Sequence, residues 1–212
     1  MVSVLPRVTK ILLCKLLHRS DYQRWTNPHS LETWWDSRTE KIARLIPQNT
    51  RVIEFGAGRR QLEKFLDPGC TYIPSDLVDR GPGTIICDLN QRPLPDLRAV
   101  NAEVAVFSGV LEYIRDLESL IAWLSHQVSF CVASYTYVLP NSSTIHKMRA
   151  KCDRLYYGYM NDYTEEAFVA LFNRCGFVCT VKDTWTSQRL FLFVNQHTKS
   201  LSTAMQTLSQ IE

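Results

Sequence analysis

The chain has 212 residues, with 24 Lys and Arg against 21 Asp and Glu, a net charge of +3, and 45% hydrophobic residues. This composition is typical of one globular domain with a large apolar core, and it excludes a disordered or collagen-like chain. No apolar run approaches the roughly 18 to 20 residues that cross a bilayer. The charge is too small to indicate a nucleic acid partner. The seven cysteines form no CxxC pair, so we expect reduced, mostly buried thiols in a cytoplasmic protein without a metal site.

Residues 1–29 are expected to form a basic amphipathic helix that packs on the body or covers it as a lid. Residues 1–20 contain four basic side chains and no acidic one: Arg7, Lys10, Lys15 and Arg19. Their apolar side chains lie near one helical face: Val8, Ile11, Leu12 and Leu16. A transit peptide or a helix on a membrane surface is the alternative, which would give peripheral membrane contact through residues 1–20.

Residues 30–195 alternate between helix-like and strand-like segments, which predicts one domain. The expected helices are residues 30–46, 59–66, 111–124 and 165–175. The expected strands are residues 50–55, 70–73, 84–87, 104–107, 128–133, 177–182 and 189–194. The last two strands are joined by a connection too short for a helical crossover, so they must pair antiparallel. Strands alternating with helices predict a mainly parallel, doubly wound α/β sheet.

Two segments stand outside this alternation. Residues 136–163 are rich in Tyr and polar groups and are expected to be a cap-like insertion. Its tyrosines either line a pocket or pack a helix on the sheet: Tyr156, Tyr157, Tyr159 and Tyr163. Residues 196–212 are rich in Ser, Thr and Gln, and we expect a flexible tail.

The chemically informative segment is residues 52–61. Gly56 and Gly58 lack Cβ atoms, so a ligand can lie against this bend, although a tight strand-to-helix turn alone would also explain it. Asp76 ends the second strand, where a carboxylate can accept hydrogen bonds from both hydroxyls of a ribose. Asp88 ends the third strand, where it can accept from an exocyclic amine. These groups would share the carboxyl edge of the sheet, where open α/β sheets bind ligands.

The residues around the bend restrict the kind of nucleotide. A dinucleotide fingerprint would have a third glycine where Gln61 stands, and no GxxxxGK[ST] segment is present. Glu54, Asp76 and Asp88 together would repel phosphates. The pattern therefore favours an adenosyl ligand without phosphates, preferably a cationic one.

Over residues 30–195 the chain resembles the class I S-adenosylmethionine-dependent methyltransferases. The matching segments, in order, are Glu54-Phe55-Gly56-Ala57-Gly58, Asp76, Asp88-Leu89 with Pro93-Leu94-Pro95, residues 107–114, Pro140-Asn141, residues 163–166 and residues 175–177. The resemblance implies a Rossmann-like seven-stranded sheet of order 3-2-1-4-5-7-6, with strand 7 antiparallel, helices on both faces and S-adenosylmethionine as cofactor. The cofactor-binding residues that it implies are Glu54, Phe55, Gly56, Ala57, Gly58, Asp76, Leu77, Asp88, Leu89, Ser108, Gly109 and Val110.

The function expected from the resemblance is methyl transfer to an O or N atom of a small-molecule acceptor. Such a displacement depends on alignment and on exclusion of water rather than on one required side chain. A hydroxyl acceptor would use a base, and His146, Tyr135 and Asp162 lie in or beside the insertion. His146 is equally explained as a solvated histidine.

Other interpretations use the same residues. Trp25, Trp34 and Trp35 fit core or lid packing as well as a ligand cage, and Arg59-Arg60 fits a solvated helical turn. A noncatalytic S-adenosylmethionine-binding module acting through a protein partner is the main alternative function. An RNA or protein methyltransferase is a third, and it predicts a basic strip beside the carboxyl edge. The pattern indicates no oligomeric state.

Overall fold

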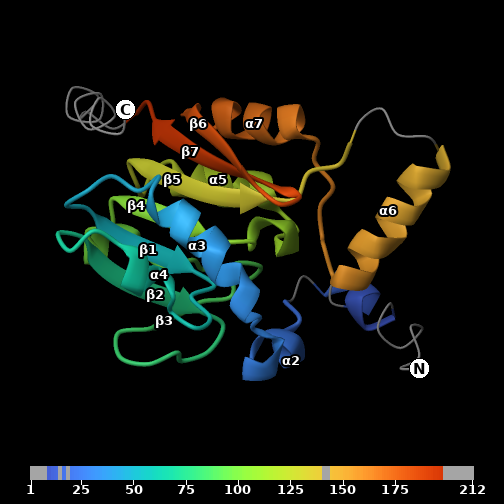
Figure 1. The fold of residues 1–212 in the computed structure, drawn as a ribbon, viewed down its shortest axis with the longest axis horizontal. Coiled ribbons are helices and arrows are strands. Elements are labelled where there is room, and N and C mark those ends of the chain that lie inside the picture. The colour runs from blue at the N-terminus through green and yellow to red at the C-terminus, as the bar shows by residue number, and fades with distance from the viewer. Residues whose placement is uncertain (1–8, 14–15, 18–19, 140–143, 198–212) are drawn as a thin grey trace.

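A computed structural model describes residues 9–13, 16–17, 20–139 and 144–197 of the chain. Its centre is a seven-stranded sheet of order β3-β2-β1-β4-β5-β7-β6 (Figure 1). The strands are β1 Arg51–Phe55, β2 Thr71–Asp76, β3 Ile85–Ile86, β4 Val104–Phe107, β5 Phe130–Tyr135, β6 Phe177–Trp185 and β7 Gln188–Asn195. All pairs among β1 to β5 are parallel, whereas β7 is antiparallel to both β5 and β6. The predicted fold is confirmed, including the antiparallel strand.

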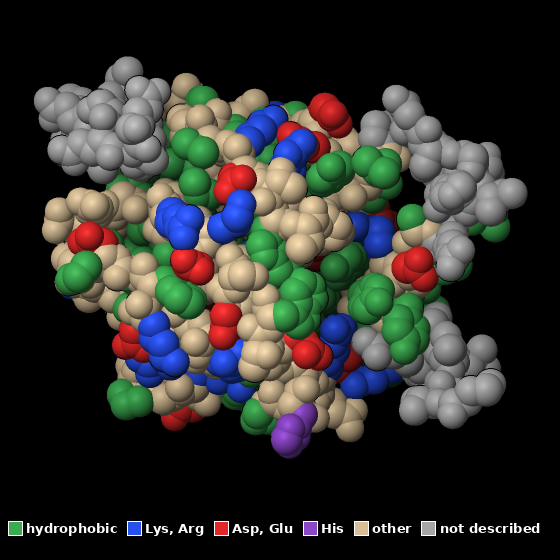
Figure 2. Space-filling view, in the orientation of Figure 1, with side chains coloured by type: hydrophobic (Ala, Val, Ile, Leu, Met, Phe, Trp, Pro, Cys, Tyr) green, Lys and Arg blue, Asp and Glu red, His purple; other side chains and the backbone are tan. Residues whose placement is uncertain are grey.

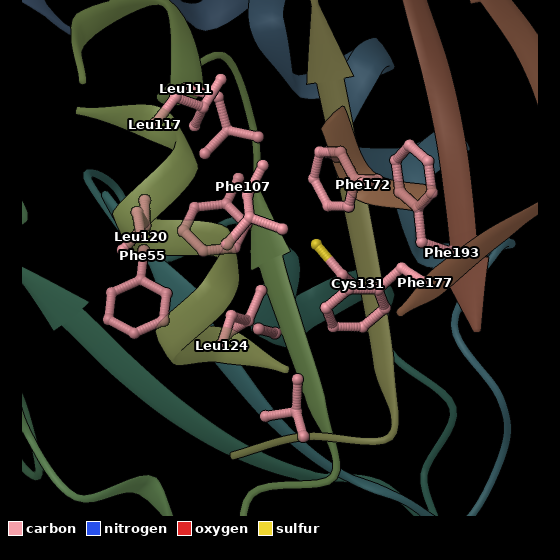
Figure 3. Close-up of a cluster of buried hydrophobic side chains, with 14 of the residues drawn as sticks. Phe55, Phe107, Leu111, Leu117, Leu120, Leu124, Cys131, Phe172, Phe177 and Phe193 are labelled. Carbon is pink, nitrogen blue, oxygen red and sulfur yellow. The ribbon is translucent and has the colours of Figure 1, made fainter. Parts of the chain in front are cut away.

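The sheet separates two hydrophobic clusters because successive side chains of a strand point to opposite faces. In β4, Ala105 and Phe107 belong to one cluster, while Val104 and Val106 belong to the other. Helices α5 (Leu117–Leu124) and α7 (Glu165–Arg174) cover the first face, where buried phenylalanines pack between helices and sheet (Figure 3). Helices α3 (Asp36–Ala43) and α4 (Leu62–Phe65) cover the second.

Three predicted helices are shorter in the structure, which corrects the expectation for residues 30–46, 59–66 and 111–124. The first region begins with the 3₁₀ turns Pro28–Ser30 and Thr33–Trp35, and only then becomes α3. The second region is helical only in α4, because Arg60 has a φ of 55°. That left-handed conformation is incompatible with a continuing right-handed helix. The third region begins with the 3₁₀ turn Leu111–Tyr113, and the α-helix α5 starts only at Leu117, after the extended residue Ile114.

The insertion contains a helix, α6 (Thr144–Tyr157), which lies beyond the carboxyl ends of the strands (Figure 1). Near its carboxyl end lies the N-terminal segment, where residues 9–13 are helical and a short helix α2 (Tyr22–Trp25) follows. The expected tail lies outside the described residues beyond position 197.

The expectation that the cysteines are mostly buried is wrong. Six cysteines fall in the part of the chain that the structure describes, and all six are free thiols. Cys131 is buried and Cys152 is exposed, while the other four are half-buried. None of the described helices has the length and hydropathy needed to span a membrane.

Candidate functional site

A cavity of about 880 Å³ opens at the carboxyl edge of the sheet. It is lined by the ends of β1, β2, β4 and β7, by the N-terminal segment and by α6. Ligand sites occupy about 300 to 1,000 Å³, so this cavity has room for a cofactor together with a small acceptor. Figure 2 shows hydrophobic side chains gathered on the same face, between the edge of the sheet and α6.

One end of the cavity, which we call the glycine end, is formed by Gly56, Gly58, Asp76 and Ser108-Gly109. Gly56 has a φ of 72°, and a Cβ atom there would lie 2.7 Å from Cγ2 of Val110. Both facts exclude a side chain at position 56 without rearrangement. Main chain therefore forms the cavity surface at this bend.

Asp76 is held in place by backbone amides. Its Oδ2 accepts a hydrogen bond from the Gly58 amide at 2.8 Å, and its Oδ1 accepts from the Leu77 amide at 2.7 Å. The Arg80 guanidinium forms an ion pair with Oδ2 at 3.2 Å, and both side chains are nearly buried. The carboxylate thus has a fixed direction on the cavity wall, and its charge is balanced by Arg80 rather than left free.

Glu54 lines the cavity but differs from Asp76 in charge. Burial raises the pKa of its carboxyl to about 8, against the lowering effect of a hydrogen bond from the Tyr72 hydroxyl at 2.6 Å. At neutral pH this carboxyl is therefore mostly protonated. The idea that three free carboxylates repel phosphates needs correction, because Glu54 is largely neutral and Asp76 is paired.

Asp88 does not line the cavity, although its neighbours Cys87 and Leu89 do. Its Oδ1 accepts hydrogen bonds from the Ser20 hydroxyl at 2.7 Å and from the Asn90 amide at 2.9 Å. The carboxylate that was expected to accept from an exocyclic amine thus contacts the N-terminal segment. That expected role stays a prediction.

The remaining residues assigned to the cofactor from the sequence lie together. Six of them line the cavity: Phe55, Ala57, Leu77, Ser108, Gly109 and Val110. The Gly109 amide donates to the Ser134 hydroxyl at 2.8 Å, which fixes the turn after β4. Eleven of the twelve assigned positions therefore meet at one cavity, and Asp88 is the exception.

Arg38 is a cavity residue that the sequence did not indicate. It lies on α3, and its guanidinium donates to Gln188 Oε1 and to the Ser108 carbonyl, each at 3.1 Å. The guanidinium also packs against the rings of Trp35 and Trp185. Burial lowers the pKa of Arg38. Its partners are 70 and 150 positions away along the chain, so no local pattern could have identified it.

The other end of the cavity, which we call the aromatic end, is walled by rings. Eight aromatic residues line it: Trp25, Trp34, Trp35, Tyr113, Tyr137, Tyr157, Tyr159 and Trp185. Trp34 stacks on Trp185 with ring centroids 4.8 Å apart, and Trp25 meets Tyr113 edge-on at 4.9 Å. These rings pack on one another, as the packing interpretation of the tryptophans predicts, and they also line the cavity, so the ligand cage stays a prediction. Tyr156 and Tyr163 are outside the lining.

Arg154 connects α6 to the body of the domain. Its guanidinium donates to the Thr136 and Asn161 carbonyls, both at 2.8 Å, and pairs with Asp162 at 2.7 Å. It also lies over the ring of Tyr159. These contacts of Arg154 help to hold the carboxyl end of α6 against the body of the domain.

The three candidate bases have different surroundings. Tyr135 is buried away from the cavity lining, and its hydroxyl donates to Asn161 Oδ1 at 2.5 Å. Asp162 is also outside the lining and pairs with Arg154. His146 falls within α6, but its side chain lies outside the part of the structure that is described. The placement of Tyr135 and Asp162 does not favour proton transfer to a ligand in the cavity.

The sequence matches no protein-family model and no curated protein. The fold, however, is similar to solved structures. A putative O-methyltransferase from Nostoc punctiforme superposes with a TM-score of 0.67 at 11% identity, over 90% of this chain and 69% of that one. The 1,6-didemethyltoxoflavin-N1-methyltransferase of Burkholderia thailandensis, solved with bound 1,6-didemethyltoxoflavin and S-adenosylhomocysteine, gives a TM-score of 0.56 at 14% identity. That match covers 77% of this chain and 81% of the Burkholderia enzyme.

Human N-acetylserotonin methyltransferase in complex with S-adenosylmethionine gives a TM-score of 0.61 at 14% identity. The match covers 84% of this chain but only 57% of the human enzyme. The neighbours share the strand order and the single antiparallel strand described above. The chain therefore has the fold of the class I S-adenosylmethionine-dependent methyltransferases.

Proposed function

We propose that this protein is an S-adenosylmethionine-dependent methyltransferase that moves a methyl group to an O or N atom of a small-molecule acceptor. The observation that carries the proposal is the glycine end: a bend of bare main chain beside Asp76, whose carboxylate is oriented by two backbone amides. A carboxylate fixed in this way suits the two hydroxyls of a ribose.

The proposed cofactor would lie along the glycine end. Asp76 would accept from the ribose hydroxyls, and Leu77 and Leu89 would enclose the adenine. The bend at Gly56 and the turn at Ser108-Gly109 would hold the amino-acid part of the cofactor. The Arg80 ion pair must share Asp76 with the ribose, because both carboxylate oxygens already accept hydrogen bonds.

The cofactor would supply a methyl group on a positively charged sulfur. The contribution of the protein is then to align the acceptor and to exclude water. The rings of Trp25, Trp34, Tyr157 and Tyr159 suit that task, because they line the cavity and aromatic rings present large apolar surfaces. Neighbouring structures of named small-molecule O- and N-methyltransferases support an acceptor of that class.

Calorimetry with S-adenosylmethionine and S-adenosylhomocysteine tests the cofactor. We expect Asp76→Asn to weaken the binding of both ligands at least about tenfold, because a carboxylate accepts stronger hydrogen bonds than an amide. Asp79→Asn is the matched control, since Asp79 is an exposed acid outside the cavity lining. Equal affinity for both variants would contradict the assignment of Asp76.

A screen for transfer of labelled methyl groups to extracted metabolites tests the reaction. We expect a labelled small molecule that depends on the intact glycine end. Binding of the cofactor without transfer to any acceptor would instead favour the noncatalytic module.

A further inference from the structure

Four leucines at the N-terminus point into solvent. Leu12, Leu13, Leu16 and Leu17 have exposed fractions of 51%, 53%, 73% and 52%. Single exposed leucines are ordinary, but four within six residues make a continuous apolar patch, which marks an interaction surface. They lie at spacings of one, four and five positions, so a helix places them on one face.

The orientation of this face is set by Ile11, which is only 2% exposed. Ile11 packs against Gly158, where a Cβ atom would lie 3.1 Å from Ile11 Cδ1. Lys10 adds an ion pair with Asp21 at 2.6 Å. With Ile11 seated on the body, the four leucines project away from it and are not available to the core.

The carboxyl end of helix α6 lies beside this segment (Figure 1). The Arg24 guanidinium donates to the Tyr157 carbonyl at 2.6 Å, joining the N-terminal segment to the end of α6 (Figure 1). Met148 on α6 is 66% exposed, and Tyr157 is 50% exposed. We call Leu12, Leu13, Leu16 and Leu17 the apolar face.

Positive charge is concentrated in the same two segments. Residues 1–20 and α6 carry eight of the 24 Lys and Arg but only one of the 21 Asp and Glu. Of these eight, Arg154 is buried and paired with Asp162, which leaves seven for an outside partner. The remainder of the chain is therefore net negative, although the whole chain is slightly positive. A helix that combines exposed leucines with an excess of basic residues is typical of segments that lie in the interface of a membrane.

We propose that the apolar face docks on an anionic lipid bilayer. The leucines would enter the boundary between headgroups and acyl chains, and the basic residues would attract anionic headgroups. A nucleic acid would use the charge but would leave the leucines exposed to water, so the observations favour lipid. Because Ala150, Asp153 and Tyr157 of α6 line the cavity, a docked molecule would hold its cavity next to the bilayer.

Cosedimentation of the full chain with vesicles tests the proposal. The vesicles contain phosphatidylcholine alone or phosphatidylcholine with phosphatidylserine. We expect binding to the anionic vesicles that weakens as salt is added, and little binding to the neutral ones. Changing the four leucines to Gln should weaken binding at least about tenfold, because the buried apolar area is lost. Ile86→Gln is the matched control, since Ile86 is 65% exposed on the distant edge strand β3.

Thermal unfolding checks that each variant is folded, and the double change of Leu16 and Leu17 to Gln replaces the fourfold variant if that one unfolds. Three results would overturn the proposal: no sedimentation with anionic vesicles, equal sedimentation of the leucine variants, or a leucine-dependent dimer that binds no vesicles. Tight binding of single-stranded RNA with no vesicle binding would assign the surface to nucleic acid. Methyl transfer does not enter any of these measurements, so the proposed function and the docking can fail separately.

Discussion

The two ends of the cavity are built in different ways. At the glycine end, Gly56, Gly58 and Asp76 lie within 21 positions, and backbone amides orient the carboxylate. At the aromatic end, Arg154 supports a helix that is inserted between β5 and α7. Arg38 joins the two ends, with one partner at Ser108 and another at Gln188. The proposed cofactor site is therefore made from local turns, whereas the proposed acceptor site depends on contacts between distant segments.

The largest expected effect on cofactor affinity comes from Gly56→Ala. The new Cβ atom would lie 2.7 Å from Val110 at a φ of 72°, on the surface where the cofactor is proposed to lie. We expect affinity for S-adenosylhomocysteine to fall about a hundredfold, or about 2.7 kcal/mol, as measured by calorimetry. Gly83→Ala is the control, because Gly83 has a φ of 79° but no atom within 4 Å of its Cβ position. Both variants carry similar backbone strain. A difference in affinity between them would therefore come from the side chain at the cavity surface rather than from the strain.

Arg154→Leu should affect the aromatic end alone. The Thr136 and Asn161 carbonyls would lose their charged donor, which costs about 2 to 4 kcal/mol of unfolding free energy. Urea unfolding measures this loss. We expect affinity for S-adenosylhomocysteine to change less than about twofold, since Arg154 makes no contact with the glycine end. A tenfold loss of cofactor affinity would show that the two ends are not independent.

This difference also explains what the sequence could predict. The strand order and the glycine bend follow from apolar runs and from residues close together along the chain. Arg38, Arg154 and Gln188 are polar residues whose burial depends on distant partners, so hydrophobic periodicity predicts exposed positions for them. The left-handed φ of Arg60 that shortens α4 has no sequence signal either, because arginine rarely adopts it.

The charge of the proposed ligand site was the property predicted least well from the sequence, and the reason is related. Counting carboxylates places three negative charges on one rim, but burial of Glu54 and pairing of Asp76 with Arg80 depend on the packed structure. Ser20 similarly contacts Asp88 from 68 positions away. Charges therefore need the surrounding protein before they can be used to choose a ligand.

The Glu54 carboxyl should make stability depend on pH. Burial raises its pKa from an ordinary value of 4.5 to about 8, so between these values the folded state binds more protons than the unfolded state. The contribution to stability is complete below pH 4.5 and is lost as pH rises through 8. We expect wild type to lose about 2 kcal/mol of unfolding free energy between pH 6 and pH 8 relative to Glu54→Gln. Urea unfolding at both pH values measures it, with Glu63→Gln as the control because Glu63 is exposed.

The smallest expected effect concerns the contact between Ser20 and Asp88. Removing the Ser20 hydroxyl in Ser20→Ala frees one hydrogen bond to Asp88 Oδ1, worth about 1 kcal/mol. If Asp88 accepts from the exocyclic amine of the adenine, the freed carboxylate should bind S-adenosylhomocysteine up to about fivefold more tightly, and Asp88→Asn should weaken binding. Thr26→Ala is the control, because its hydroxyl donates to the Tyr22 carbonyl in the same segment and does not line the cavity. Unchanged affinity in both Ser20→Ala and Asp88→Asn would mean that Asp88 serves to fix the N-terminal segment, and the adenine contact predicted from the sequence would then be wrong.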